Sequence, residues 1–125
     1  MDAYNPMKAP SIADWIELDE AERLDLVLAY HQQLRDKIPN LNAHAAAHVM
    51  VENQVALADE TPVASVMDRL MQEGLDRHEA IHAIGSVLMG VLAETVQGES
   101  HEDPTPTYYR ELMQLTAEKW LSEEL

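Results

Sequence analysis

Hydrophobic residues recur every three to four positions along most of this chain, which is the spacing of one face of an α-helix. The segment 20–38 follows this spacing. Asp19, with Glu22 three residues later, has the pattern of a capping box at a helix start. Pro39 is expected to stop this helix. The pattern therefore predicts an amphipathic helix near the N-terminus.

Further segments repeat the pattern between short breaks at proline and glycine. No segment alternates between apolar and polar residues at every second position, so the pattern predicts an all-α protein. Residues 1–10 lack any periodicity and are expected to form a loosely ordered tail. The expected elements are a short turn at 11–17 and five helices at about 20–38, 42–58, 62–73, 76–97 and 107–122.

The length and the short links restrict the architecture. A chain of 125 residues is expected to form one all-α domain, 1–125. Links of two to six residues favour antiparallel neighbours. We expect antiparallel helical hairpins stacked as a small α-superhelix, and the alternative is an up-down helical bundle.

Composition excludes several classes of function. The chain has 8 basic and 23 acidic residues and a formal net charge of -15, which would repel nucleic-acid phosphates and anionic membrane surfaces. It contains no cysteine, so disulfides and thiolate metal sites are excluded. The N-terminus lacks the pattern of a secretory signal, and no apolar run approaches the roughly 20 residues of a membrane span. A cytoplasmic protein with neither nucleic-acid nor membrane partners is expected.

Two polar stripes interrupt the apolar pattern. Four residues advance a helix by about 400°, so His44, His48 and Glu52 share one face with a drift of about 40° per step. His78 and His82 repeat the spacing on a later helix. Histidines four residues apart on a helix can bind one ion together. If the two helices face each other, the stripes form one site.

A metal site and a polar network both explain these stripes. Imidazoles together with Glu52 form a ligand set suited to one divalent ion, Zn²⁺, Fe²⁺ or Mn²⁺. In the alternative, the imidazoles form hydrogen bonds with Glu52, Asn53 or backbone carbonyls across a helix contact. Arg77 is expected in this polar cluster, either paired with Glu52 or Glu73 or bound to a substrate anion.

His78, Glu79 and His82 also match the motif H-E-x-x-H, in which two histidines bind zinc and the glutamate acts as general base. A metallohydrolase with Glu79 as catalytic base is therefore a minor alternative. Asp76 and Glu79 have capping-box spacing, which would instead direct the glutamate to the helix backbone. The motif alone does not distinguish these two roles.

Two histidines lie outside the stripes. His31 falls on the apolar line of the first long helix, where a histidine at the edge of the core is a commoner outcome than a fifth metal ligand. His101 lies in a polar linker and receives no role.

Three segments together resemble a family of small bacterial proteins and domains of unknown function. They read DWIELDEAERLDLVLAYH, HAAAHVMVENQVA and RLMQEGLDRHEAIHAIGSVL, and they span roughly residues 12–95. The family shares an H-x-x-x-H-x-x-x-E-N-Q element followed by R-H-E-A-x-H. The resemblance implies a bacterial cytoplasmic protein with a helical-hairpin fold, and it implies no activity. The matching positions are His44, His48, Glu52, Asn53, Arg77, His78, Glu79 and His82.

The sequence thus leaves two classes of function open. In one, a metal ion between two helices supports chemistry or stability. In the other, the protein is a helical interaction module whose polar cluster is structural. The C-terminal helix, with Tyr108, Leu112 and Trp120 on one face, would then receive a protein partner or a second copy of the chain.

Overall fold

The structure is a computed structural model that describes residues 1–34, 38–98 and 103–124. Within these residues the chain forms seven α-helices and no strand, which confirms the all-α class. A short 3-10 turn, Ala58–Glu60, follows α3. The helices are α1 (Ile12–Glu17), α2 (Glu20–Gln32), α3 (Leu41–Ala56), α4 (Val63–Gln72), α5 (Arg77–Gln97), α6 (Thr105–Gln114) and α7 (Ala117–Glu124).

Capping residues set the ends of the helices that carry the stripes. The Asp19 side chain accepts a hydrogen bond from the Glu22 N–H, and the Glu22 side chain accepts one from the Asp19 N–H, so the expected capping box of α2 is confirmed. Asp76 caps α5 by accepting from the Glu79 N–H at 2.7 Å. Gly74, with φ of +115°, ends α4 in a conformation that favours glycine.

The C-terminal region differs from the single helix expected at 107–122. Leu115 is extended and separates α6 from α7. Thr116 Oγ1 then accepts a hydrogen bond from the Lys119 N–H at 3.1 Å, as a helix cap does. The Ala117 N–H donates to Glu73 Oε1 at 2.9 Å. The break therefore satisfies donors at the start of α7 and ties α7 to the end of α4.

Helix α2 also ends earlier than expected, at Gln32, well before Pro39. Nothing in the described residues explains this end. Residues 35–37 of the expected helix lie outside the described part of the chain, as does His101.

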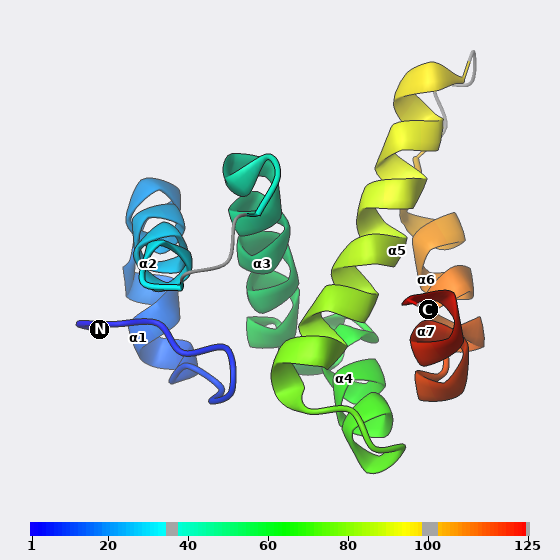
Figure 1. The fold of residues 1–125 in the computed structure, drawn as a ribbon, viewed down its shortest axis with the longest axis horizontal. Helices are drawn as coiled ribbons and strands as arrows, with labels where there is room; N and C mark the ends of the chain where they lie inside the picture. The colour runs from blue at the N-terminus through cyan, green and yellow to red at the C-terminus, as the bar shows by residue number, and fades with distance from the viewer. Residues whose placement is uncertain (35–37, 99–102, 125) are drawn as a thin grey trace.

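Figure 1 shows α2, α3 and α5 as neighbouring helices with α3 in the middle, and α6 and α7 lie on the other side of α5. The apolar interior has two parts. One includes Val51 of α3 together with residues of α4, α5 and α6. The other includes Ala45 and Val49 of α3 together with Trp15 and Val27. Because α3 contributes to both parts, its polar stripe lies at the seam between them.

The N-terminal segment differs from the loosely ordered tail expected from the sequence. It contains no helix, yet Tyr4 is 3% exposed and Pro6 is fully buried. The Tyr4 ring packs against Trp15, with ring centroids 6.0 Å apart. A large aromatic ring gains free energy on burial, and its hydroxyl here finds polar partners inside the protein. Tyr4 therefore anchors the segment against the helices.

Helix α5 is long and apolar enough to cross a membrane by length and composition alone, with mean hydropathy 1.3 over its most apolar stretch. This differs from the expectation that no apolar run approaches that length. About two-fifths of that stretch, 39%, is buried inside the protein, and the core helix of a water-soluble protein passes the same test. The composition of α5 is therefore weak evidence for a membrane segment.

Candidate metal centre

Five histidines from three helices lie close together. Their ring nitrogens form two groups, and within each group the candidate ligand atoms lie within 4.8 Å of one another. The interior group is His31, His48 and His78, and the pocket group is His44, His48 and His82. Helices α2, α3 and α5 thus all contribute, and the buried His48 belongs to both groups. In the part of the chain that the structure describes, neither group includes a carboxylate.

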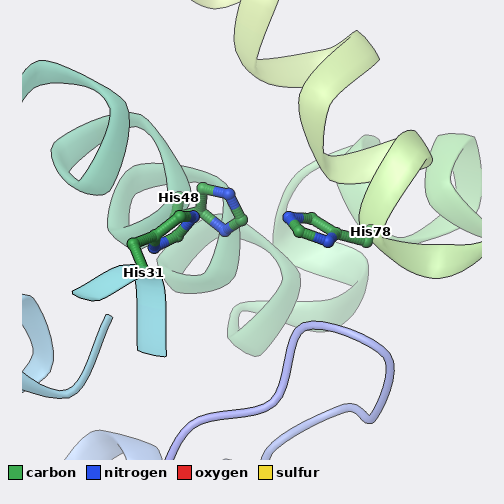
Figure 2. Close-up of side chains that lie close together, drawn as sticks. All are labelled: His31, His48 and His78. Carbon is green, nitrogen blue, oxygen red and sulfur yellow. The ribbon is translucent and has the colours of Figure 1, made fainter. Parts of the chain in front are cut away.

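The two predicted stripes do face each other. Figure 2 shows the rings of the interior group directed toward one another, with His48 between His31 and His78. Small residues allow the close approach of α3 and α5: a Cβ atom added to Gly85 would lie 3.7 Å from the Cβ of Ala47.

The ring of His31 is fixed in one tautomer. Its Nδ1 lies 2.8 Å from the backbone carbonyl oxygen of Val27. A carbonyl only accepts hydrogen bonds, so Nδ1 carries a proton, and in the neutral ring Nε2 carries the lone pair. Metal-binding histidines commonly have this arrangement, in which one nitrogen donates to a carbonyl and the other faces the ion. His31 is buried, as expected, but it also joins the cluster.

The ring of His48 is oriented by Tyr4 and Glu52. The Tyr4 hydroxyl donates to Glu52 Oε2 at 2.6 Å. Because a phenol has a single proton, its oxygen can then only accept from His48 Nδ1, which lies 3.3 Å away. His48 Nε2 is therefore the unprotonated nitrogen. No sequence pattern points to Tyr4 as part of this site, because it lies in a segment without periodicity.

Three buried nitrogens in the cluster have no hydrogen-bond partner: His31 Nε2, His44 Nε2 and His78 Nε2. A buried polar atom without a partner costs about 1–3 kcal/mol. Such atoms in a folded protein call for an explanation, and a bound ion is one. The polar-network alternative predicts that these nitrogens are paired, so it does not account for them.

The remaining ring contact also suits a shared ion. His48 Nε2 and His82 Nε2 are 3.2 Å apart. Two nitrogens bound to one tetrahedral zinc ion at about 2.0–2.1 Å would lie about 3.3–3.4 Å apart. Without an ion, His82 must donate its proton to His48, because His48 Nε2 is unprotonated. The geometry therefore allows either a hydrogen bond or a pair of ligands.

The electrostatics keep four of the five imidazoles neutral, those of His44, His48, His78 and His82, and the neutral form is the one that binds metals. Burial, followed by the neighbouring imidazoles, lowers the pKa of His48 to about 2. The same causes lower the pKa of His82 to about 4. Burial is also the main cause that lowers the pKa values of His44 and His78. Around neutral pH these lone pairs are free.

Glu52 shares the stripe of His44 and His48, but its carboxylate is held by Arg77. The two guanidinium nitrogens donate to Glu52 Oε1 at 2.7 Å and to Oε2 at 2.9 Å, and both side chains are buried. Burial alone would lower the pKa of Arg77, but the hydrogen bond and charge of Glu52 raise it. The expected Arg77–Glu52 pair is present. Direct ligation by Glu52 is not what the geometry favours, because both oxygens already accept hydrogen bonds.

Asn53 and Gln54 point away from the cluster, because successive residues of a helix turn by about 100°. Asn53 Oδ1 accepts from Trp15 Nε1 and from Arg23, and Gln54 Oε1 accepts from the Tyr108 hydroxyl at 2.6 Å. The residues Glu52 to Gln54 therefore tie α3 to four other helices, α1, α2, α5 and α6. They do not satisfy one another.

Glu79 is directed toward α7. Its Oε2 accepts a hydrogen bond from Trp120 Nε1 at 2.8 Å. Only half of the expected capping box forms. The Asp76 side chain accepts a hydrogen bond from the Glu79 N–H, but the Glu79 carboxylate accepts from Trp120 instead of from the Asp76 N–H. The two histidines of H-E-x-x-H thus join the cluster, and the glutamate does not. This geometry gives no support to Glu79 as a general base.

A pocket of about 370 Å³ opens beside the pocket group. Its walls come from α3, α5 and the ring of Trp120, and His44, His48 and His82 line it. The cluster is therefore reachable by small molecules from one side.

The face expected to receive a partner is largely used within the chain. Tyr108 is 4% exposed and Leu112 is fully buried, and both belong to the core. Only Trp120 of the three is partly exposed. Tyr108 and Leu112 therefore do not form an exposed docking face. A partner at the C-terminal helices stays a prediction.

No family model matches the chain, and neither the curated proteins nor the solved structures include a match. The resemblance to small bacterial proteins with the H-x-x-x-H-x-x-x-E-N-Q element therefore stays a prediction.

Proposed function

We propose that the protein binds one divalent transition-metal ion in the histidine cluster, with His48 as a central ligand. The observation that carries this proposal is the set of three buried ring nitrogens without hydrogen-bond partners, on His31, His44 and His78. An ion in the interior group would bind the rings of His31 and His78, and an ion in the pocket group would bind the ring of His44. The carbonyl of Val27 orients one of these rings, that of His31, and the hydroxyl of Tyr4 orients one further ring, that of His48.

The donor set narrows the choice of metal. With Glu52 held by Arg77, the cluster offers imidazole nitrogens alone. Imidazole suits Zn²⁺ and Fe²⁺, whereas Mn²⁺ favours oxygen ligands. Zinc or iron is therefore a better fit than manganese. The ion would act as a Lewis acid toward a small ligand, or would hold α2, α3 and α5 together.

The proposal includes the arrangement of the helices. We take α2 with α3, and α4 with α5, to be antiparallel hairpins stacked side by side, because α3 contacts both α2 and α5. In such a stack the middle helix presents ligands to both neighbours. A metal ion at the seam would then stabilise the stack against separation of the hairpins.

Zinc titration of untagged protein, stripped of metal with a chelator, tests the proposal. Calorimetry is expected to show about one ion per chain for the wild type. His48→Gln removes the nitrogen common to both groups and is expected to weaken zinc binding by at least about 100-fold. His31→Gln and His44→Gln each remove a ligand from only one group.

Glu79→Gln is the matched control. It changes the H-E-x-x-H motif without removing a ring nitrogen, and glutamine can still accept from Trp120. Its zinc affinity is expected to equal that of the wild type. Wild-type protein that binds zinc no more tightly than a folded His48→Gln variant would contradict the proposal.

A further inference from the structure

We infer that the pocket beside the pocket group binds a small carboxylate, whose charged end reaches the metal ion and whose apolar end lies between α3 and α5. This inference rests on the proposed metal site, and it adds the class of ligand that the site would take.

The pocket lies directly beside three of the candidate ligands. His44, His48 and His82 all line it, so an ion held by these rings would have a coordination position facing the pocket. Sites with three protein ligands and an open position are those at which zinc binds exchangeable ligands. The volume of about 370 Å³ lies near the lower end of the range for small-molecule sites. The ligand is therefore small.

Charge provides the second argument. Imidazole binds a metal ion as a neutral ligand, and the charge of Glu52 is compensated by Arg77, so the two charges of the ion would remain uncompensated in a partly buried site. The chain has 23 acidic residues, yet the described residues lining the pocket include no Asp, Glu, Lys or Arg. Nothing in the pocket wall would therefore repel an anion or compete with it for the ion.

The walls provide the third argument. Apart from the three histidines, the lining is mainly apolar, with Asn40 and Ser86 as its other polar residues. The apolar side chains are those of Pro39, Ala43, Ala47, Ile81, Met89 and Trp120. The hydrogen bond from Trp120 Nε1 to Glu79 fixes the indole as part of the wall. Such walls favour an aliphatic or aromatic group, and they offer few partners to a strongly hydrated anion such as phosphate. An apolar monocarboxylate matches both the charge and the walls.

Calorimetric titration of zinc-loaded protein with sodium acetate, sodium hexanoate and 1-hexanol tests the inference. Hexanoate is expected to bind about tenfold more tightly than acetate or more, because two or more of its extra methylene groups become buried. Hexanol lacks the charge and is expected to bind more weakly than hexanoate. Metal-free protein is expected to show no measurable hexanoate binding.

Ser86→Phe and Ala93→Phe are matched variants on α5. Both positions are exposed, but only Ser86 lines the pocket. Ser86→Phe is expected to weaken hexanoate binding about tenfold or more without changing zinc affinity. Ala93→Phe is expected to leave both unchanged.

The outcomes separate this inference from the proposal on which it rests. Equal affinities for acetate and hexanoate, or hexanoate binding that does not depend on zinc, would overturn the carboxylate pocket while leaving the metal site in place. Zinc and hexanoate binding that survive His44→Gln unchanged would overturn the placement of the ion in the pocket group. Failure of the wild type to bind zinc would remove the metal site itself.

Discussion

Replacing Arg77 by methionine is expected to lower the free energy of unfolding by about 3–5 kcal/mol, because it leaves the buried carboxylate of Glu52 without its cation. Domains of this size are stable by only about 5–15 kcal/mol, so the loss is a large part of the total. The guanidinium also donates to the Pro6 carbonyl at 2.9 Å, so the N-terminal segment loses an anchor as well. Urea unfolding followed by tryptophan fluorescence measures the change.

A double-mutant cycle with Glu52→Gln isolates the ion pair. Removing both charges together is often nearly neutral, whereas removing one leaves an uncompensated buried charge. The double variant Glu52→Gln with Arg77→Met is therefore expected to be more stable than Arg77→Met alone. If the free energy of unfolding of Arg77→Met lies within about 1 kcal/mol of the wild-type value, the ion pair contributes little to stability.

The metal-free protein is expected to lose stability as the pH falls from about 7 to about 5. His48 titrates at 6.5 in the unfolded chain and at about 2 in the folded protein. Between these values the unfolded chain binds a proton that the folded protein does not, so acid favours unfolding. The contribution of His48 is fully present above pH 6.5 and is lost progressively below it. At about 1.4 kcal/mol per pH unit, this loss reaches about 2 kcal/mol at pH 5.

Urea unfolding at the two pH values, with a chelator present, measures this effect. Gln does not titrate, so His48→Gln is expected to lose about 2 kcal/mol less than the wild type over the same range. His82 also has a lowered pKa but is partly exposed, and His82→Gln is expected to show a smaller difference. The same loss in all three proteins would mean that other groups cause the acid sensitivity.

Local sequence signals predicted most of the helices. Asp19 with Glu22, and Asp76, mark helix starts that depend on nearby residues, and the structure places them there. The break between α6 and α7 depends instead on a distant carboxylate, that of Glu73, which no local pattern reveals. The burial of Tyr4 is likewise a long-range effect, since its hydrogen-bond partners His48 and Glu52 lie more than 40 residues away.

The sequence predicted the candidate site only in part, because local spacing shows which residues share a helix face but not which helices meet. Helical spacing shows that His44 and His48 share a face, and that His78 and His82 do, and the structure brings both pairs together. Spacing does not show which neighbour a helix meets, so His31 was placed at the core but not in the cluster.

The two glutamates show a further limit of spacing. A drift of about 80° from His44 carries Glu52 toward Arg77, and a turn of about 100° from His78 carries Glu79 toward Trp120. A motif that lists residue types at fixed intervals does not record these partners. H-E-x-x-H therefore describes two residues of the cluster and one that lies outside it.

X-ray absorption at the zinc edge of the loaded, untagged protein tests most directly whether the histidine cluster is a metal site. The account predicts a first shell at about 2.0–2.1 Å with the outer-shell scattering of at least three imidazole rings. His48→Gln should lose that pattern, and Glu79→Gln should keep it. A first shell of oxygen atoms without imidazole scattering in the wild type would show that the histidine cluster does not bind the zinc ion.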